Sequence, residues 1–240
     1  DHLMSISPLK AQAAAFGITL NDAQMSAFAT YHDALVTWNS HTNLTAITDE
    51  AGVRVRHFLD SLSIAKADPL KAGARLIDVG TGAGFPGLAL KIVYPEVQVT
   101  LLEATGKKIA FLEHVIQQLG LHGVETLHAR AVDAGQLPDQ RGAYDVVTAR
   151  AVARLPVLLE YLLPLAKIGG RCIAMKGKTA EEEARDSEKA LRVLGGKLRE
   201  IIPITLPGID ESHHLVVVEK IAATPRQYPR KPGIPTRKPI

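Results

Sequence analysis

The segment from Leu76 to Gly87 constrains the fold of this chain more than any other part of it. The apolar run Leu76-Ile77-Asp78-Val79 leads into a loop with glycines at positions 80, 82 and 84, and a new apolar run begins at Leu88. Alternate glycines between a buried strand and a helix let a ligand approach the backbone, because side chains there would obstruct it. We therefore predict a strand, loop and helix that bind a nucleotide-like ligand.

From Arg75 onward, apolar runs alternate with amphipathic helices, which is the pattern of a parallel sheet wound by helical crossovers. The last two apolar runs are separated by a Pro-Gly turn, and so short a reversal joins antiparallel strands. The expected strands are Arg75 to Val79, Val97 to Leu102, Val124 to His128, Tyr144 to Ala149, Gly170 to Met175, Lys197 to Leu206 and His214 to Ile221. We predict an α/β, Rossmann-like fold with a mostly parallel seven-stranded sheet and an antiparallel hairpin at its edge.

Three regions are expected along the chain. Asn21 is a good N-cap for a helix with apolar residues at three- and four-residue spacing, and further helices are expected from Leu9 to Phe16 and after Thr48. Residues 1–70 should form an N-terminal helical cap, residues 71–224 the cofactor-binding core and residues 225–240 a C-terminal arm. Five prolines among the last sixteen residues argue against a packed helix in that arm.

The C-terminal arm also concentrates positive charge. The chain has a formal net charge of +3, and residues 225–240 hold five basic residues and no acid, so the remainder carries −2. A positive arm on a slightly acidic body favours a polyanionic partner such as RNA. The candidate phosphate ligands in the arm are Arg226, Arg230, Lys231, Arg237 and Lys238.

Cysteine usage and hydropathy exclude other classes of function. The single cysteine, Cys172, allows neither an internal disulfide nor a cysteine-based zinc site, and no metal is expected. No apolar run reaches the roughly 18 residues that a membrane span requires. We expect a cytoplasmic monomer that does not bind membranes.

A carboxylate at the end of the second expected strand defines the class of ligand. Glu103 lies 23 residues beyond Gly80, where it can accept hydrogen bonds from both hydroxyls of a ribose. The glycine loop and Glu103 together predict a nucleoside-containing cofactor.

Two cofactors fit this pattern. Gly82, Gly84 and Gly87 also satisfy the dinucleotide spacing G-x-G-x-x-G, so an NAD-dependent oxidoreductase stays open as an alternative. S-adenosylmethionine is favoured by Asp78, which could reach a cationic methionyl end, by Pro86 after the loop and by the antiparallel hairpin. A non-catalytic RNA-binding protein with the same fold is a third possibility, against which the intact loop and Glu103 argue.

The residues after the fourth strand bear on the atom that a methyltransferase would modify. Amino-group methyltransferases commonly have Asp or Asn, two prolines and an aromatic residue there, whereas this chain has Thr148-Ala149-Arg150-Ala151-Val152. Methylation at carbon five of a pyrimidine needs a cysteine nucleophile, and Cys172 lies within an apolar strand. An acceptor with a free lone pair, such as guanine N7, is left, and its methylation needs alignment more than a base.

At these residues the chain resembles the RsmG, or GidB, family of 16S ribosomal RNA guanine-N7 methyltransferases. The matching runs are Asn43-Leu44-Thr45, His57-Phe58-Leu59-Asp60-Ser61-Leu62, the loop from Asp78 to Gly87, Leu101-Leu102-Glu103, Ala149-Arg150-Ala151, Lys176-Gly177 and Tyr228-Pro229-Arg230-Lys231. The resemblance implies a class I S-adenosylmethionine-dependent methyltransferase that acts, without a covalent intermediate, on N7 of one guanine in 16S ribosomal RNA, free or within the small subunit.

The resemblance also assigns roles to particular residues. It implies that Ala131 and Val132 flank the adenine, and that Arg150 faces the methionyl end or the incoming base, as the one candidate for a catalytic, orienting role. Many family members have an acid where this chain has Val132, which leaves the adenine amine to the backbone or to Asp133. The complete set of expected cofactor ligands is Asp78, Gly80, Thr81, Gly82, Phe85, Glu103, Ala104, Ala131, Val132 and Arg150.

Outside the arm, four further residues are candidates for contact with RNA. Lys176 and Lys178 close the fifth strand, at the sheet edge where ligands bind in wound sheets. Arg54 and His57 lie on the third expected helix, where a solvated surface role is the alternative.

Overall fold

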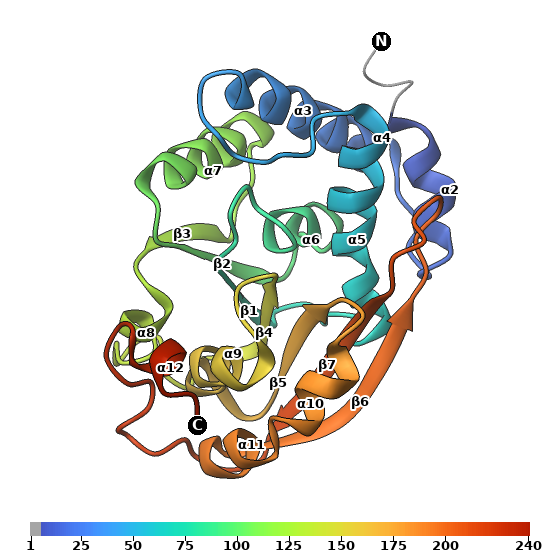
Figure 1. The fold of residues 1–240 in the computed structure, drawn as a ribbon. Helices are drawn as coiled ribbons and strands as arrows, with labels where there is room; N and C mark the ends of the chain where they lie inside the picture. Colours follow the sequence, from blue (N-terminus) through green and yellow to red (C-terminus); the bar gives the residue numbers. More distant parts are fainter. Residues whose placement is uncertain (1–5) are drawn as a thin grey trace.

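The computed structural model describes residues 6–240 and contains one seven-stranded sheet in the order β3-β2-β1-β4-β5-β7-β6 (Figure 1). Its first five strands in that order are parallel, and β7 runs antiparallel to both β5 and β6. The strands are β1 (Arg75–Val79), β2 (Gln98–Glu103), β3 (Val124–His128), β4 (Tyr144–Arg150), β5 (Ala166–Lys176), β6 (Gly196–Ile204) and β7 (His213–Lys220). All seven predicted strands, their mostly parallel order and the edge hairpin are confirmed.

Helices cover both faces of the sheet (Figure 1). One face carries α6 (Gly87–Val93) and α7 (Gly106–Leu119), and the other carries α9 (Leu155–Leu162), α10 (Ala180–Arg185) and α11 (Glu188–Leu194). Neighbouring strand residues alternate between the two cores: Leu76 and Leu101 belong to the first, and Ile77 and Leu102 to the second. This alternation is why these strands are apolar throughout, as expected for a sheet that is buried on both faces.

The N-terminal helices pack onto the face that carries α6 and α7. They comprise α2 (Pro8–Ala14), α3 (Asp22–Asn39) and one continuous helical stretch of α4 (Glu50–Gly52), η1 (Val53–Leu59), α5 (Asp60–Leu62) and η2 (Ser63–Lys66). Asn21 caps α3 as predicted, because its side chain accepts the Gln24 amide N–H while the Gln24 side chain accepts that of Asn21. The η1 segment is a π-helix, and it carries His57 towards the glycine loop.

The C-terminal residues fold back onto the core, which corrects the expectation of an arm without a packed helix. A short helix, α12 (Ile234–Arg237), follows Gly233 and contacts α9. Pro235 lies in the first turn of α12, where a missing N–H removes no helical hydrogen bond, and its side chain is buried.

Two shorter elements complete the chain, α8 (Ala131–Ala134) and η3 (Leu163–Leu165). Within residues 6–240, no helix is long and apolar enough to cross a membrane.

Candidate functional site

The glycine loop leaves β1 in a conformation that only its glycines adopt easily. Gly80 and Gly82 have φ values of +67° and +60°, in the left-handed region that strains other residues. A Cβ added at Gly82 would meet no atom within 4 Å, whereas one added at Gly80 would lie 2.9 Å from Cγ2 of Val152. The loop therefore presents bare backbone to open space at Gly82, and at Gly80 it lies directly beneath the segment that follows β4.

The buried carboxylate of Asp78 stabilises this loop through hydrogen bonds. Its Oδ2 accepts hydrogen bonds from the Thr81 hydroxyl at 2.6 Å and the Gly87 amide at 2.8 Å, and Oδ1 accepts one from Thr148. Burial raises the pKa of Asp78 to about 6, although these hydrogen bonds act in the opposite direction. Asp78 is fully buried and Thr81 nearly so. The structure thus assigns both residues to the shape of the loop, and not to the direct cofactor contact expected of Asp78.

Phe85 is likewise buried, within a stack of rings. The His57 ring lies parallel to Phe85 at 4.4 Å between centroids, and the Tyr31 ring stacks on Phe85 at 5.2 Å. Tyr31 also donates a hydrogen bond to the carbonyl oxygen of Ala83. These contacts join the glycine loop to α3 and η1, so the N-terminal helices help to fix the loop.

Beside the loop is a cavity of about 370 Å³, which we call the glycine-loop cavity. Among the predicted cofactor ligands, it is lined by Gly80, Glu103, Ala104, Ala131 and Val132. Sequence reasoning missed eight further lining residues, namely Val79, Leu102, Ala129, Arg130, Val152, Tyr161, Pro232 and Gly233. Asp133, the suggested substitute for a carboxylate at Val132, is exposed and does not line it.

Glu103 is the carboxylate of this cavity, and the local backbone already orients it. Oε1 accepts the Gly82 amide N–H and Oε2 accepts that of Thr105, both at 2.9 Å. The side chain is 7% exposed. Each carboxylate oxygen can accept a second hydrogen bond, so the orientation that these amides impose leaves acceptor capacity for a ligand.

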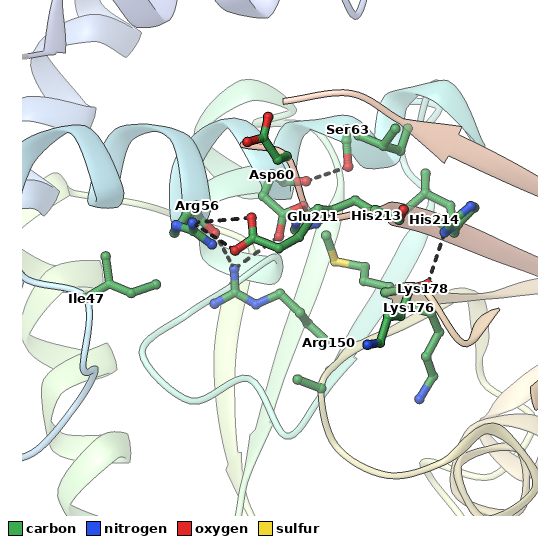
Figure 2. Close-up of a pocket in the computed structure, with 17 residues that line it drawn as sticks. Ile47, Arg56, Asp60, Ser63, Arg150, Lys176, Lys178, Glu211, His213 and His214 are labelled. Atoms are coloured by element: carbon green, nitrogen blue, oxygen red, sulfur yellow. Dashed lines mark hydrogen bonds and ion pairs between the residues drawn. The ribbon is translucent and has the colours of Figure 1, made fainter. Parts of the chain in front are cut away.

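A second cavity, of about 700 Å³, lies beyond the end of β4, and we call it the Arg150 cavity (Figure 2). It is lined by Ile47, Arg56, Asp60, Ser63, Arg150, Ala151, Met175, Lys176, Gly177, Lys178, Ile204 and residues 210–215. Its charged groups have both signs: Arg56, Arg150 and Lys178 face the same space as Asp60 and Glu211. Such a lining offers hydrogen-bond donors and acceptors to one ligand.

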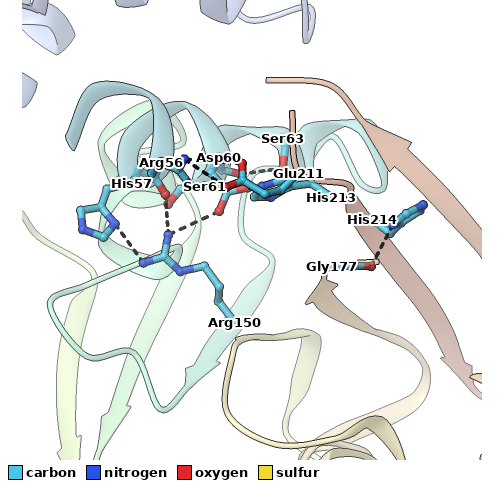
Figure 3. Close-up of polar contacts among 10 residues, drawn as sticks. All are labelled: Arg56, His57, Asp60, Ser61, Ser63, Arg150, Gly177, Glu211, His213 and His214. Carbon is cyan, nitrogen blue, oxygen red and sulfur yellow. Dashed lines mark hydrogen bonds and ion pairs between the residues drawn. The ribbon is translucent and has the colours of Figure 1, made fainter. Parts of the chain in front are cut away.

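Arg150 is fixed by contacts on three sides (Figure 3). Nη1 donates to the Arg56 carbonyl oxygen at 2.9 Å and lies 3.4 Å from the Asp60 carboxylate, and Nη2 lies 3.1 Å from His57 Nδ1. Its guanidinium also sits over the Phe85 ring, 5.3 Å from the centroid. Burial and the adjacent Arg150 charge lower the pKa of His57 to about 3, so this imidazole is neutral and accepts from Arg150.

The two cavities meet across the segment 150–152. Arg150 and Ala151 line one cavity and Val152 lines the other, and Ala151 has a left-handed φ of +51°. This backbone turn sends successive side chains to opposite sides. The linings of the two cavities are therefore adjacent along the chain at Ala151 and Val152.

Three of the residues expected to contact RNA are engaged inside the protein instead. Lys176 forms a 3.1 Å ion pair with Glu183, and both side chains are under 10% exposed. Arg230 pairs with the buried Glu160 at 2.8 Å, and His57 is buried and neutral. These three are not free phosphate ligands, which corrects the prediction.

The other candidates for RNA contact have side chains that are exposed or partly exposed. Exposed basic side chains belong to Lys178, Arg226, Lys231, Arg237 and Lys238, whereas Arg54 is partly exposed within η1. Lys178 is the exposed one that lines the Arg150 cavity. For these residues, contact with RNA stays a prediction.

Comparison with solved structures places the fold among known methyltransferases. A structure titled a SAM dependent methyltransferase from Aquifex aeolicus superposes with a TM-score of 0.53 and 20% identity, covering 71% of this chain and 94% of that one. M. jannaschii TYW2, solved in complex with AdoMet, superposes with a TM-score of 0.52 and 17% identity over 63% of this chain and 71% of its own. At these identities the likeness concerns the fold, a Rossmann-like class I methyltransferase architecture.

Sequence relatives are much closer. The ribosomal RNA small subunit methyltransferase G of Alkaliphilus metalliredigens is 50% identical over 224 residues, which are 93% of this chain and 94% of the relative. That of Pelotomaculum thermopropionicum is 49% identical over 97% of both chains. The family model GidB, described as rRNA small subunit methyltransferase G, matches residues 24–211. With a glycine loop, a strand-end carboxylate and two adjoining cavities, this chain belongs to the GidB family.

Proposed function

We propose that this protein transfers the methyl group of S-adenosylmethionine to N7 of a guanine in 16S ribosomal RNA. The observation that carries the proposal is the pair of adjoining cavities, one with the glycine loop and Glu103 and the other with Arg150 and groups of both charges. The names of the relatives support small-subunit ribosomal RNA as substrate. The choice of guanine N7 rests on the chemistry of the second cavity and on the family resemblance.

The glycine-loop cavity fits the adenosine part of S-adenosylmethionine. Glu103 would accept the ribose hydroxyls, and Ala131 and Val132 would flank the adenine, with Gly80 and Ala104 completing the lining on the side of the glycine loop. When bound, this cofactor supplies an electrophilic methyl group on a sulfonium sulfur. The protein has to hold that methyl group at the boundary of the two cavities and exclude water from it.

The side chains around Arg150 favour an acceptor atom that needs no activation. His57, with a pKa of about 3, is too weak a base to remove a proton near neutral pH. Cys172 is buried in β5, and burial raises its pKa to about 12, so it cannot serve as a nucleophile for carbon methylation. Guanine N7 carries a lone pair at neutral pH, and its attack requires neither group.

Guanine also matches the mixed charge of the Arg150 cavity. Its O6 accepts hydrogen bonds, as from Arg150 or from His213, whose pKa is raised by its hydrogen bond to Asp60, and the N7 lone pair is then left free for attack. Its N1–H and amino group are donors that a carboxylate such as Asp60 can accept. Rate acceleration then comes from alignment of N7, methyl carbon and sulfur, with Arg150 as a positioning residue.

The test is methyl transfer to small-subunit RNA and to small-subunit particles that lack the modification, with isotopically labelled S-adenosylmethionine. Borohydride reduction and aniline cleavage break RNA specifically at 7-methylguanine, which identifies atom and nucleotide together. Arg150→Lys should lower kcat/KM by about 10- to 100-fold, because it keeps the charge but loses the planar guanidinium that is fixed on three sides. Arg154→Lys, in an exposed pair with Asp186, is the matched control.

Labelled product that resists aniline cleavage would overturn the choice of N7. Binding of NAD in place of S-adenosylmethionine would overturn the proposed reaction altogether. An Arg150→Lys variant with the activity of the control would remove Arg150 from the site.

A further inference from the structure

The C-terminal segment contributes to the glycine-loop cavity although it is about 130 residues away in sequence from Glu103. Pro232 and Gly233 line that cavity together with Tyr161 of α9. The remaining lining residues come from the ends of β1 and β2, from residues 129–132 and from Val152. Figure 1 shows the C-terminal chain passing beside α8 and α9. This side of the cavity is therefore built by a separate part of the chain.

A buried ion pair anchors the segment. Glu160, on α9, is 1% exposed, and its carboxylate accepts the Arg230 backbone N–H at 2.7 Å and side-chain hydrogen bonds from Nε and Nη2. Arg230 Nη2 also donates to the Lys238 carbonyl oxygen at 2.7 Å, which ties the two ends of the segment together. A buried carboxylate with such a partner becomes very unfavourable when the partner leaves. The segment is thus held in place from the inside of the protein.

A second anchor lies just before the ion pair. Arg141 donates to the carbonyl oxygens of Thr224, Pro225 and Tyr228 at distances of 2.6 to 3.1 Å. Pro229 packs so closely on Gly135 that a Cβ added there would lie 2.7 Å from the proline ring. Both ends of residues 225–230 are therefore fixed before the chain reaches Pro232.

We propose that residues 228–237 form the outer wall of the cofactor site, and that Glu160, which does not line the cavity, sets cofactor affinity through Arg230. This inference rests on the proposed use of S-adenosylmethionine, but not on the choice of RNA atom. Pro232 and Gly233 give the cavity an apolar lining with little side-chain bulk, which suits the face of an adenine ring. Glu160 and Arg230 are positioning residues, because they touch the wall and not the ligand.

This wall changes what the basic residues of the segment can do. Arg230 is paired with Glu160 and anchors the segment. The exposed basic residues of the segment are Arg226, Lys231, Arg237 and Lys238. Loss of the anchor should therefore impair cofactor binding directly. Neutralising a single exposed cation should leave cofactor binding intact.

The first experiment measures binding of S-adenosylhomocysteine by calorimetry to the full-length protein and to Glu160→Gln. The substitution keeps the volume of the side chain but loses the charge and one acceptor oxygen. We expect the Kd to rise by about tenfold or more. Without the anchor, residues 228–237 would be less ordered in the free protein, and binding would carry the entropic cost of ordering them. Arg226→Gln, which neutralises an exposed cation of the same segment, should keep the wild-type Kd within about twofold.

A KM–kcat split separates this role from general damage to the fold. Glu160→Gln should raise the KM for S-adenosylmethionine, and kcat at saturating cofactor should stay near the wild-type value. If Glu160→Gln does not fold, a chain that ends at Arg230 keeps the ion pair and removes Pro232 and Gly233, and it should show the same loss of affinity. Wild-type affinity in the truncated chain, or in a folded Glu160→Gln variant, would overturn the wall; failure of the wild-type protein to bind S-adenosylhomocysteine would instead overturn the proposed cofactor.

Discussion

Replacement of Glu103 by alanine is the sharpest single test of the glycine-loop cavity. The substitution removes the proposed acceptor for the ribose hydroxyls and also the two acceptors for the Gly82 and Thr105 amides. Loss of hydrogen bonds to a charged group costs about 1.5 to 3 kcal/mol, so the Kd for S-adenosylmethionine should rise by about 10- to 150-fold. S-adenosylhomocysteine contains the same ribose and should lose affinity by the same factor.

The measurement has to separate lost contact from lost structure. The two amides freed by Glu103→Ala should lower the free energy of unfolding by about 1 to 3 kcal/mol, which thermal unfolding would detect. Glu103→Gln keeps one acceptor oxygen and should fall between wild type and alanine in both measurements. Glu113→Ala, at an exposed contact with Thr126, controls for the removal of a carboxylate. A folded Glu103→Ala protein with the wild-type Kd would refute the assignment of the ribose to this carboxylate.

Three further changes test the loop and the reaction. Gly80→Val should abolish cofactor binding measured by calorimetry, because its side chain would meet Val152 at a left-handed φ; retained affinity would contradict the loop geometry. Cys172→Ala should keep methyl transfer in a labelled-cofactor assay, and loss of turnover in a folded variant would return carbon methylation to consideration. The Asp78 pKa lies near 6, above its ordinary 3.8, so its stabilising contribution should be complete below about pH 4 and be lost as pH rises through 6. The melting temperature of the wild type relative to Asp78→Asn should thus fall between pH 4 and 7, and a pH-independent difference would show that Asp78 titrates normally.

The sheet could be predicted from sequence because its signals are local. Strands buried on both faces appear as apolar runs, and Glu103 could be placed because it directly follows such a run. The direction of the Asp78 side chain could not be obtained in this way. Its partners are Thr81 and Gly87 within the loop and Thr148 on β4, and the last of these is adjacent only in the folded sheet.

The ion pairs of the basic residues could not be predicted from the sequence for the same physical reason. A lysine at a strand end and an arginine in a Pro-rich tail look like free cations until their acidic partners are placed in space. In the structure, Lys176 pairs with Glu183, and Arg230 pairs with Glu160, which lies 70 positions earlier in the chain. Charge counting along the chain overestimated the cations available to RNA because it could not see these buried pairs.

These internal ion pairs agree with a reaction that depends on position. The proposed transfer to a lone pair needs no proton removal, so it would require the protein chiefly to hold a cofactor and a base in line and keep water out. Arg150–Asp60 borders the Arg150 cavity, Lys176–Glu183 fixes the end of β5 beside it, and Arg230–Glu160 fixes the chain that closes the glycine-loop cavity. Arg150–Asp60 and Arg230–Glu160 join segments that are far apart in sequence, whereas Lys176–Glu183 joins the end of β5 to the helix that follows it. Two of the cations that the sequence presents as candidate RNA ligands, Lys176 and Arg230, are thus held in these pairs, and contact with RNA stays a prediction for the exposed cations.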